Sequence, residues 1–341
     1  RPERRCRPAW PTFGGMRMRV LLGLAAAIAL AACSSDGDGG GAGAGAAAPA
    51  PAGERFQFAV IGDYPYTPED VPKFDRLIDA INAEAPALVL HVGDISNVAC
   101  TDAALNASLA ALGRFAMPVV YTPGDNEWTD CQGAGADPLE RLGRVRQLFF
   151  PTDQSLGRRT LTVTRQSAEY PENSRFFAGD VTFVAVHQVG SSNGTGRSPE
   201  GDAEAAARAD AGAAWVRAGF AAAAASRGIV VFFQADPNFD LYRLGVRNVH
   251  TPFLRTIERE AIQYGKPVLL VHGDTHVFRV DKALVGSGDG RPIENVTRLE
   301  NFGEREVHWS RVTVDRAGPE LFVVTPGIVA ANVVPHPVPP R

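Results

Sequence analysis

The chain has 341 residues, of which 45% are hydrophobic and 21% are charged, and its formal net charge at pH 7 is −4. This length is sufficient for one large folded domain with its own apolar core. The slightly acidic balance, without a basic stripe or interleaved basic and aromatic residues, gives no indication of a nucleic-acid-binding surface.

The N-terminal part of the chain has the features of a secretion signal. Residues 1–15 are rich in Arg and Pro and match no element of a fold, so we treat them as a doubtful N-terminal extension. Residues 16–32 combine two arginines with an apolar run that is too short to span a membrane. This combination predicts a signal peptide, and Cys33 follows it directly.

The sequence Leu-Ala-Ala-Cys that ends at Cys33 resembles the bacterial lipobox, which implies that Cys33 is lipidated. The alternative is an ordinary cut near Ala32, with a cysteine that plays no part. Residues 33–54 are almost entirely Gly, Ala, Ser, Pro and Asp, which predicts a flexible tether. We therefore expect a periplasmic lipoprotein of the bacterial cell envelope that meets the membrane through its lipid only. Ser34 favours the outer membrane by the same resemblance.

Residues 55–330 show the alternation of strands and helices that is typical of an α/β domain. The expected strands are 56–62, 87–92, 118–122, 159–165, 174–178, 181–187, 229–234, 267–271, 277–281, 307–314 and 320–325. The expected helices are at about 70–84, 101–114, 137–150, 202–226 and 251–264. The early strand-helix-strand order predicts a parallel sheet. The Pro-rich end, residues 331–341, is expected to be a disordered tail.

Four of the apolar, strand-like runs end in Gly-Asp, with the aspartates Asp63, Asp94, Asp125 and Asp274. An acid that follows a buried parallel strand lies at the carboxyl edge of the sheet, where open α/β sheets bind ligands. Carboxylates gathered there repel one another unless something positive lies between them, so the pattern predicts one or two divalent metal ions. For any single Gly-Asp pair, a plain turn is the simpler interpretation.

The candidate metal ligands are these four aspartates and His276, which comes two residues after Asp274. Asn97 and Asn126 lie close to two of the aspartates in the sequence. Carboxylate and amide oxygens with a single imidazole favour Mn, Mg or Ca, with Fe or Zn as the alternative.

Cys100 and Cys131 each follow one of the Gly-Asp pairs by six residues, so both are placed on loops at the same edge of the sheet. In an oxidising compartment we expect them to form a disulfide, and two free thiols are the alternative. A metal-binding role is disfavoured because neither has a Cys-x-x-Cys partner.

The order and spacing of these motifs resemble those of the calcineurin-like metallophosphoesterases, over roughly residues 56–325. That family carries Asp-x-His, Gly-Asp-x-x-Asp/Asn, Gly-Asn-His-Asp/Glu, His-x-Pro and Gly-His-x-His after successive strands. The corresponding stretches here begin at Gly62, Gly93, Gly124, Gln234 and Gly273. The resemblance implies an α/β fold, namely a four-layer α/β/β/α sandwich of two mixed sheets.

The individual matches to these motifs are partial. Pro65, Ala235 and Asp274 stand where the family has histidine. Asp125 and Asn126 stand where it has Asn and His. Two of these replacements keep groups that can bind a metal ion, since aspartate replaces His at one position and Asn at another.

The resemblance also implies how the ligands divide between two ions. Asp63, Asp94 and His276 would hold the first ion. Asp94 would bridge to a second ion, which Asp125 and Asp274 help to bind. A metal-bound hydroxide would then attack phosphorus while the cation offsets the charge that develops on the phosphoryl oxygens.

We therefore expect a metal-dependent hydrolase of phosphate mono- or diesters, which acts as a monomer on a small phosphorylated substrate. Asp94 and Asn126 are the predicted catalytic residues, and Asn126 can donate a hydrogen bond to phosphate but cannot act as a general acid. The accessory candidates are Asn97, His187, Asp236 and His272. The alternative is a catalytically degenerate member that serves as a metal- or ligand-binding envelope protein, because fold does not imply function.

Overall fold

The computed structural model of the protein describes residues 55–63, 65–95 and 100–335. The predicted extension, signal peptide, lipidation site Cys33 and tether lie outside these residues, and so does Asn97. Of the helices in the described part of the chain, none has both the length and the apolar character that crossing a membrane requires.

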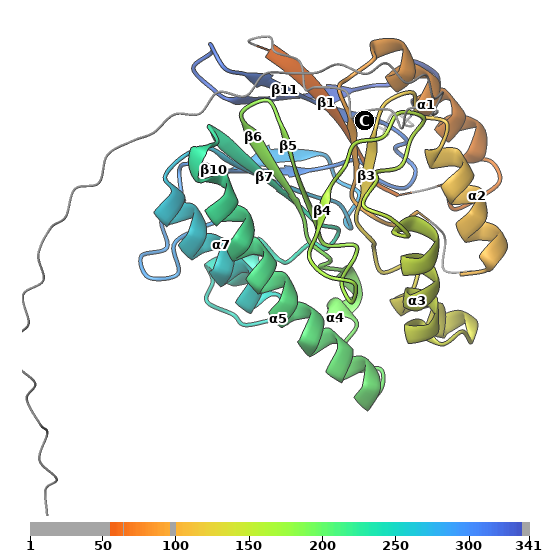
Figure 1. The fold of residues 1–341 in the computed structure, drawn as a ribbon, viewed down its shortest axis with the longest axis horizontal. Helices are drawn as coiled ribbons and strands as arrows, with labels where there is room; N and C mark the ends of the chain where they lie inside the picture. Colours follow the sequence, from red (N-terminus) through yellow and green to blue (C-terminus); the bar gives the residue numbers. More distant parts are fainter. Residues whose placement is uncertain (1–54, 64, 96–99, 336–341) are drawn as a thin grey trace, which may run out of the picture. The chain divides into compact units, whose positions relative to one another are not determined.

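Two mixed β-sheets form the centre of the described fold (Figure 1). The first contains, in spatial order, β12 (Phe322–Gly327), β11 (Trp309–Asp315), β1 (Arg55–Ile61), β2 (Val89–His91) and β3 (Val119–Tyr121). The second contains β4 (Thr164–Arg165), β5 (Ser174–Ala178), β6 (Val181–Ala185), β7 (Gly228–Phe232), β8 (Val268–His272), β10 (Val296–Glu300) and β9 (Arg279–Asp281). Strands β1 to β3 run parallel, and so do β6, β7, β8 and β10.

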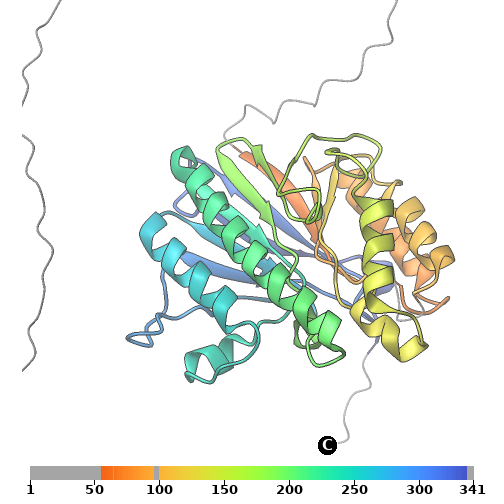
Figure 2. The same cartoon turned by 60° about the horizontal axis from the view of Figure 1, so that its bottom comes forward.

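Helices cover the outer face of each sheet, so the elements stack as α/β/β/α, as the sequence predicts. Against the first sheet pack α1 (Val71–Glu84), α2 (Asp102–Leu112) and α3 (Pro138–Phe149). Against the second pack α5 (Pro199–Ala222) and α7 (Thr251–Tyr264). Figure 2 shows α5 and α7 side by side in green and cyan, with the orange and yellow helices of the first sheet on the opposite side. A layer of apolar side chains fills the space between the two sheets. In this layer the ring centroids of Phe58 and Phe183 are 5.2 Å apart.

Hydrophobic spacing explains why these segments form these elements. In α1 the buried residues are Phe74, Leu77, Ile78 and Ile81, which recur with the helical period and form one apolar stripe. In β7 and β8 every residue is buried, because each strand has a helix layer on one face and the other sheet on the opposite face.

One strand of the second sheet is absent from the sequence prediction. Strand β10 carries Arg298 and Glu300, and both are buried. Arg298 donates to Asp281 of β9 at 2.9 Å, and Arg279 of β9 forms an ion pair with Glu300. These ion pairs between strands neutralise the buried charges of β10. The same charged residues interrupt the apolar pattern, so the sequence did not indicate a strand here.

Other boundaries also differ from the predicted ones. The strand expected at 159–165 is reduced to β4, because residues 159–163 are irregular apart from an isolated β-bridge between Thr162 and Gln154. Residues 331–335 belong to the described chain, and Asn332 is buried, with its amide donating to the carbonyls of Lys73 and Val307. The remaining short elements are α4 (Gly190–Asn193), α6 (Phe239–Arg243), η1 (Thr129–Ala134), η2 (Ala223–Ala225) and η3 (Ala330–Asn332).

The register of the parallel strands brings their carboxyl ends to one level. In the first sheet Ile61, His91 and Tyr121 lie side by side as the last residues of β1, β2 and β3. In the second sheet Phe232 of β7 pairs with Val271 of β8. The loops that follow these strands therefore start together, which is the condition for a shared site.

A disulfide ties two of these loops together. Cys100 and Cys131 are bonded, with their Cα atoms 5.6 Å apart, and both side chains are buried. Cys100 follows the loop after β2, and Cys131 belongs to η1 after β3. The bond thus links the segments that carry Asp94 and Asp125.

The double variant Cys100→Ala/Cys131→Ala is expected to lose roughly 2–4 kcal/mol of unfolding free energy, because the bond closes a long loop in the unfolded chain. Urea unfolding followed by circular dichroism measures the loss. A reductant should destabilise the wild type by a similar amount and leave the double variant unchanged. If the wild type is insensitive to reductant, the expected contribution of the disulfide is wrong.

Candidate metal centre

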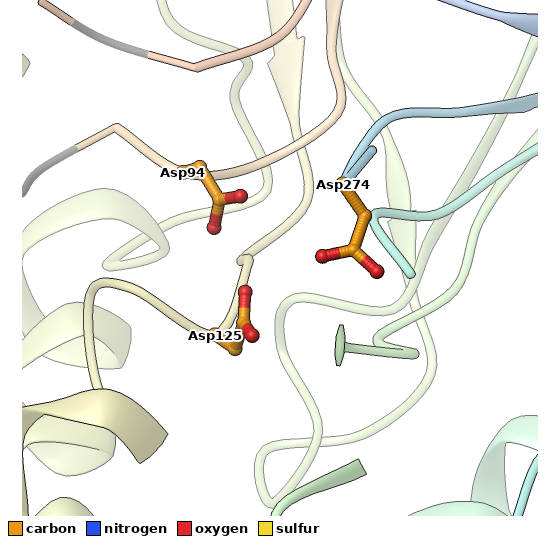
Figure 3. Close-up of side chains that lie close together, drawn as sticks. All are labelled: Asp94, Asp125 and Asp274. Carbon is orange, nitrogen blue, oxygen red and sulfur yellow. The ribbon is translucent and has the colours of Figure 1, made fainter. Parts of the chain in front are cut away.

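Three of the four predicted aspartates converge at the carboxyl ends of the two sheets. Asp94, Asp125 and Asp274 each offer an oxygen atom, and these atoms all lie within 4.8 Å of one another. Figure 3 shows the three carboxylates directed toward a common space. Asp94 and Asp125 come from the first sheet and Asp274 from the second, so the site forms only where the sheets meet. We refer to these three residues as the aspartate trio.

The amide of Gln234 lies among the trio, and sequence analysis did not select it as a site residue. Its Nε2 donates to Asp94 Oδ2 at 2.9 Å, to Asp125 Oδ1 at 2.9 Å and to Asp274 Oδ1 at 3.1 Å. Its Oε1 accepts a hydrogen bond from the backbone N–H of Gly190 at 2.7 Å. The sequence signal that could have identified it is a polar residue just beyond the apolar strand β7. In the structure this residue is fully buried.

The segment after β7 therefore differs from the motif alignment. The alignment put the metal-ligand position at Ala235, but this methyl side chain is fully buried, and Gln234 is the residue that reaches the trio. Asp236 contributes through its backbone, whose N–H donates to Asp274 Oδ2 at 2.8 Å. Its carboxylate instead accepts from the N–H of Asn238 at 3.0 Å, in a local turn.

Asp63, the fourth predicted aspartate, belongs to a neighbouring set of polar side chains. Its Oδ1 accepts from Tyr66 Oη at 2.5 Å and lies 3.0 Å from His276 Nε2. Asn126 joins this set to the trio, because its Nδ2 donates to Tyr66 Oη at 2.8 Å and its backbone N–H donates to Asp94 Oδ1 at 3.3 Å. Tyr66 is a second site residue that sequence analysis missed. It lies three residues after Asp63 but belongs to none of the motifs that the sequence analysis used.

Left-handed backbone conformations aim the ligands. Asp63, Asp94, Asp274 and His276 have φ values of 59°, 60°, 78° and 64°. Non-glycine residues rarely occupy this region, and each instance costs roughly 1–3 kcal/mol. Four such residues in the loops after β1, β2 and β8 show that the fold holds a strained arrangement that brings these side chains together.

Glycines make room for the carboxylates. A Cβ atom on Gly124 would lie 2.0 Å from Asp94 Oδ1, and one on Gly303 would lie 2.2 Å from Asp63 Oδ2. A Cβ atom on Gly190 would lie 2.6 Å from Asp274 Oδ1 and 2.7 Å from Asp125 Oδ2. These close approaches explain why the loops around the site carry glycine at these three positions.

The trio is electrostatically unfavourable when all three groups are ionised. Burial, and then the charge of Asp125, raise the pKa of Asp94 well above its ordinary value. Burial also raises the pKa of Asp125, although a hydrogen bond from the Ser191 hydroxyl opposes the shift. Burial and the charge of Asp125 raise the pKa of Asp274 to about 7. Without a cation, the trio therefore retains protons near neutral pH.

The two accessory histidines lie in other surroundings. His187 Nδ1 is 2.8 Å from Glu172 Oε1, and Glu172 also pairs with Arg146. His272 Nδ1 lies 3.0 Å from the Gly273 carbonyl, and its ring stacks on Phe233. Burial lowers the pKa of His272 to about 3, so this ring is neutral. The Nε2 atom of each ring is buried and has no hydrogen-bond partner among the described residues, so both histidines stay accessory candidates.

The comparison with protein-family models agrees with this architecture. The family model for calcineurin-like phosphoesterases matches residues 56–278. No curated protein matches the chain in sequence. Among solved structures, a dimetal phosphatase from Danio rerio is similar, with 13% identity, a TM-score of 0.47, and coverage of 79% of this chain and 98% of that one.

Two further structures are similar at the same level. PhoD has 12% identity and a TM-score of 0.49, and the match covers 82% of this chain and 70% of that chain. The purple acid phosphatase PPD1 from yellow lupin seeds has 11% identity and a TM-score of 0.48. That match covers 83% of this chain and 56% of the lupin chain. Since the family model spans well over half of the sequence, the chain belongs to the calcineurin-like phosphoesterase family.

Proposed function

We propose that this protein is a metal-dependent hydrolase of phosphate mono- or diesters. The observation that carries the proposal is the convergence from two sheets of the buried Asp94 and Asp125 and the half-buried Asp274. Membership of a metal-dependent phosphoesterase family supports the same reaction class. The substrate is proposed to be a small phosphorylated molecule, and the protein to act as a monomer.

The residues of the site suit a divalent cation. Three carboxylates meet in a space that glycines keep open, and burial with mutual repulsion raises the pKa values of Asp94 and Asp274, an effect that a cation among them would offset. Oxygen ligands of this kind favour Mg, Mn or Ca, and the dominance of oxygen donors makes a zinc site of the His/Cys type a poorer fit. When bound, such an ion supplies Lewis-acid charge for phosphoryl oxygens and lowers the pKa of a water molecule.

The chain's own groups then bind and orient the ester. The trio and Asp63 would hold the cation or cations, with Asp94 between the two groups of ligands. Asn126 lies beside Asp94, and its side-chain amide is a neutral donor that suits a phosphoryl oxygen. The hydrogen bond to Asp63 raises the pKa of His276, so this ring must release a proton before it can bind a metal ion.

A second function is favoured by one specific observation. The Gln234 amide already donates to all three carboxylates, and Pro65 and Asn126 stand where the family has histidine. These features suit a catalytically degenerate protein that binds a metal ion or a small ligand at the cell envelope. Metal binding without turnover would identify this second function.

The location of the protein is proposed mainly from residues 16–54, whose sequence predicts a signal peptide and a lipidation site. The signal peptide and the cysteine that follows it support a lipoprotein of the bacterial envelope, anchored through Cys33 in the outer membrane. A substrate in the periplasm is then the natural partner. The disulfide between Cys100 and Cys131 suits the same oxidising compartment.

The variant Asp94→Asn tests the enzyme directly. We expect Mn²⁺ binding to weaken and turnover of p-nitrophenyl phosphate or its bis ester to fall by about 100-fold or more, because one of the carboxylates that would hold the ion is lost. Titration calorimetry and a colorimetric assay measure the two effects. Asp210→Asn, at an exposed position on α5, serves as the matched control. Turnover that survives in Asp94→Asn would come from a contaminant, and a wild type without metal affinity would end the proposal.

The stability of the metal-free protein should depend on pH. Folding raises the pKa of Asp274 to about 7, and also those of Asp94 and Asp125, so the folded state binds more protons than the unfolded chain. Stability is then lost as pH rises from about 4 through about 7. A bound cation replaces the protons, so the gain in melting temperature on adding Mn²⁺ should be larger at about pH 8 than at about pH 5. Equal gains at both pH values would contradict this.

The variant Gly190→Ala should disturb the site by a steric clash, without changing any charged group. Its new Cβ would collide with the carboxylates of Asp274 and Asp125, so we expect Mn²⁺ affinity to fall about tenfold and stability to fall by roughly 1–3 kcal/mol. Gly133→Ala is the matched control, because a Cβ there meets nothing within 4 Å. Calorimetry and thermal unfolding measure both variants. Unchanged metal affinity in Gly190→Ala would show that the carboxylates can move without loss.

A further inference from the structure

The orientation of the Gln234 amide is fixed by its surroundings. The oxygen faces the Gly190 N–H, which can only donate, and the nitrogen faces three carboxylates, which can accept. In the opposite orientation, Oε1 would face three carboxylate oxygens, and the NH₂ group would face the N–H of Gly190. The amide is neutral, so it cancels none of the negative charge, and its two N–H groups are shared among three carboxylate acceptors.

This orientation cannot persist when a cation occupies the space among the trio. An amide nitrogen that carries two protons has no lone pair to offer a metal ion, whereas the amide oxygen is a good ligand for Mg, Mn or Ca. The terminal torsion of Gln is broad, so the amide can turn over without a new backbone conformation. Turning it over removes the acceptor from the N–H of Gly190.

Gly190 begins a strained left-handed turn, which makes this contact consequential. Ser191, Ser192 and Asn193 have φ values of 45°, 57° and 55°, and Gly194 continues at 78°. Left-handed conformations cost roughly 1–2 kcal/mol per non-glycine residue. Such a run persists only when its surroundings hold it in place.

Both ends of this turn are held by identifiable side chains. At the far end Arg208, which is fully buried, donates to Asn193 Oδ1 at 2.6 Å and to the Asn193 carbonyl at 2.8 Å. At the near end the side-chain contact to the Gly190 N–H comes from Gln234. The amide of Gln234 therefore connects the trio to the turn.

We propose that Gln234 is an exchangeable occupant of the metal position. In the metal-free protein its NH₂ group holds the trio, and on metal binding it turns over, binds the ion through Oε1 and releases the N–H of Gly190. This proposal rests on the proposed function, because it needs a divalent cation at the trio. It adds an unassigned ligand and a coupling between metal occupancy and the turn at 190–194.

The Mn²⁺ affinity of Gln234 variants distinguishes a side chain that binds the ion from one that only competes with it. If Gln234 becomes a ligand, Gln234→Ala should weaken Mn²⁺ binding by about 10–100-fold, whereas Gln234→Glu should bind at least as tightly as the wild type. If the amide only competes with the ion, Gln234→Ala should bind Mn²⁺ more tightly, which overturns the proposal. Titration calorimetry provides the comparison. Gln166→Ala is the matched control, because Gln166 also uses both ends of its amide, with Ala211 and Asn173 as partners.

Hydrogen exchange tests the coupling without any activity assay. The Gly190 amide should exchange slowly in the metal-free protein and faster once Mg²⁺ is bound, because it has lost its acceptor. The Ala235 amide, which donates to the Gln188 carbonyl at 3.0 Å, should stay equally protected in both states. Unchanged protection of Gly190 on metal binding overturns the coupling.

Mn²⁺ binding by the wild type and by Gln234→Ala distinguishes failure of the proposed function from failure of this inference. A wild type that binds no divalent cation removes both the proposed function and this inference. A wild type that binds Mn²⁺, together with a Gln234→Ala variant that binds it equally well, removes the inference and leaves the proposed function intact.

Discussion

Repulsion among buried carboxylates is the constraint around which this site is built. Asp94, Asp125 and Asp274 are brought within 4.8 Å of one another, where water can screen their charges only weakly. The protein tolerates this in the absence of an ion because the raised pKa values keep protons on the trio and because Gln234 donates to all three side chains. The surrounding strain and the glycines follow from the need to keep these acids together.

The fold supplies the rigidity that such an arrangement needs. The side chains of the site follow strands β1, β2, β3, β7 and β8, whose last residues are buried. Loops on rigid strands can hold left-handed residues such as Asp63 and Asp274 in place. The disulfide between Cys100 and Cys131 adds a covalent tie between two of these loops.

The altered motifs change the chemistry more than the architecture. An aspartate at position 125 or 274 still offers oxygen to a cation, but it adds negative charge where the family has neutral Asn or His. More negative charge favours tighter binding of hard cations and raises the cost of the empty site. A neutral amide at Gln234, able to donate or to bind a metal ion, is one way to reduce that cost.

The sequence by itself determined the fold class, the family and most of the acidic residues that converge at the site, because buried strands and Gly-Asp pairs are local patterns. It could not show that Gln234, rather than Ala235, reaches the trio, since both residues lie in a bend after β7, where the sequence does not fix the direction of each side chain. Nor could it find Tyr66, Gly190 or strand β10, whose roles depend on partners far away in the chain. Those contacts exist only where the two sheets meet, so only the tertiary structure decided them.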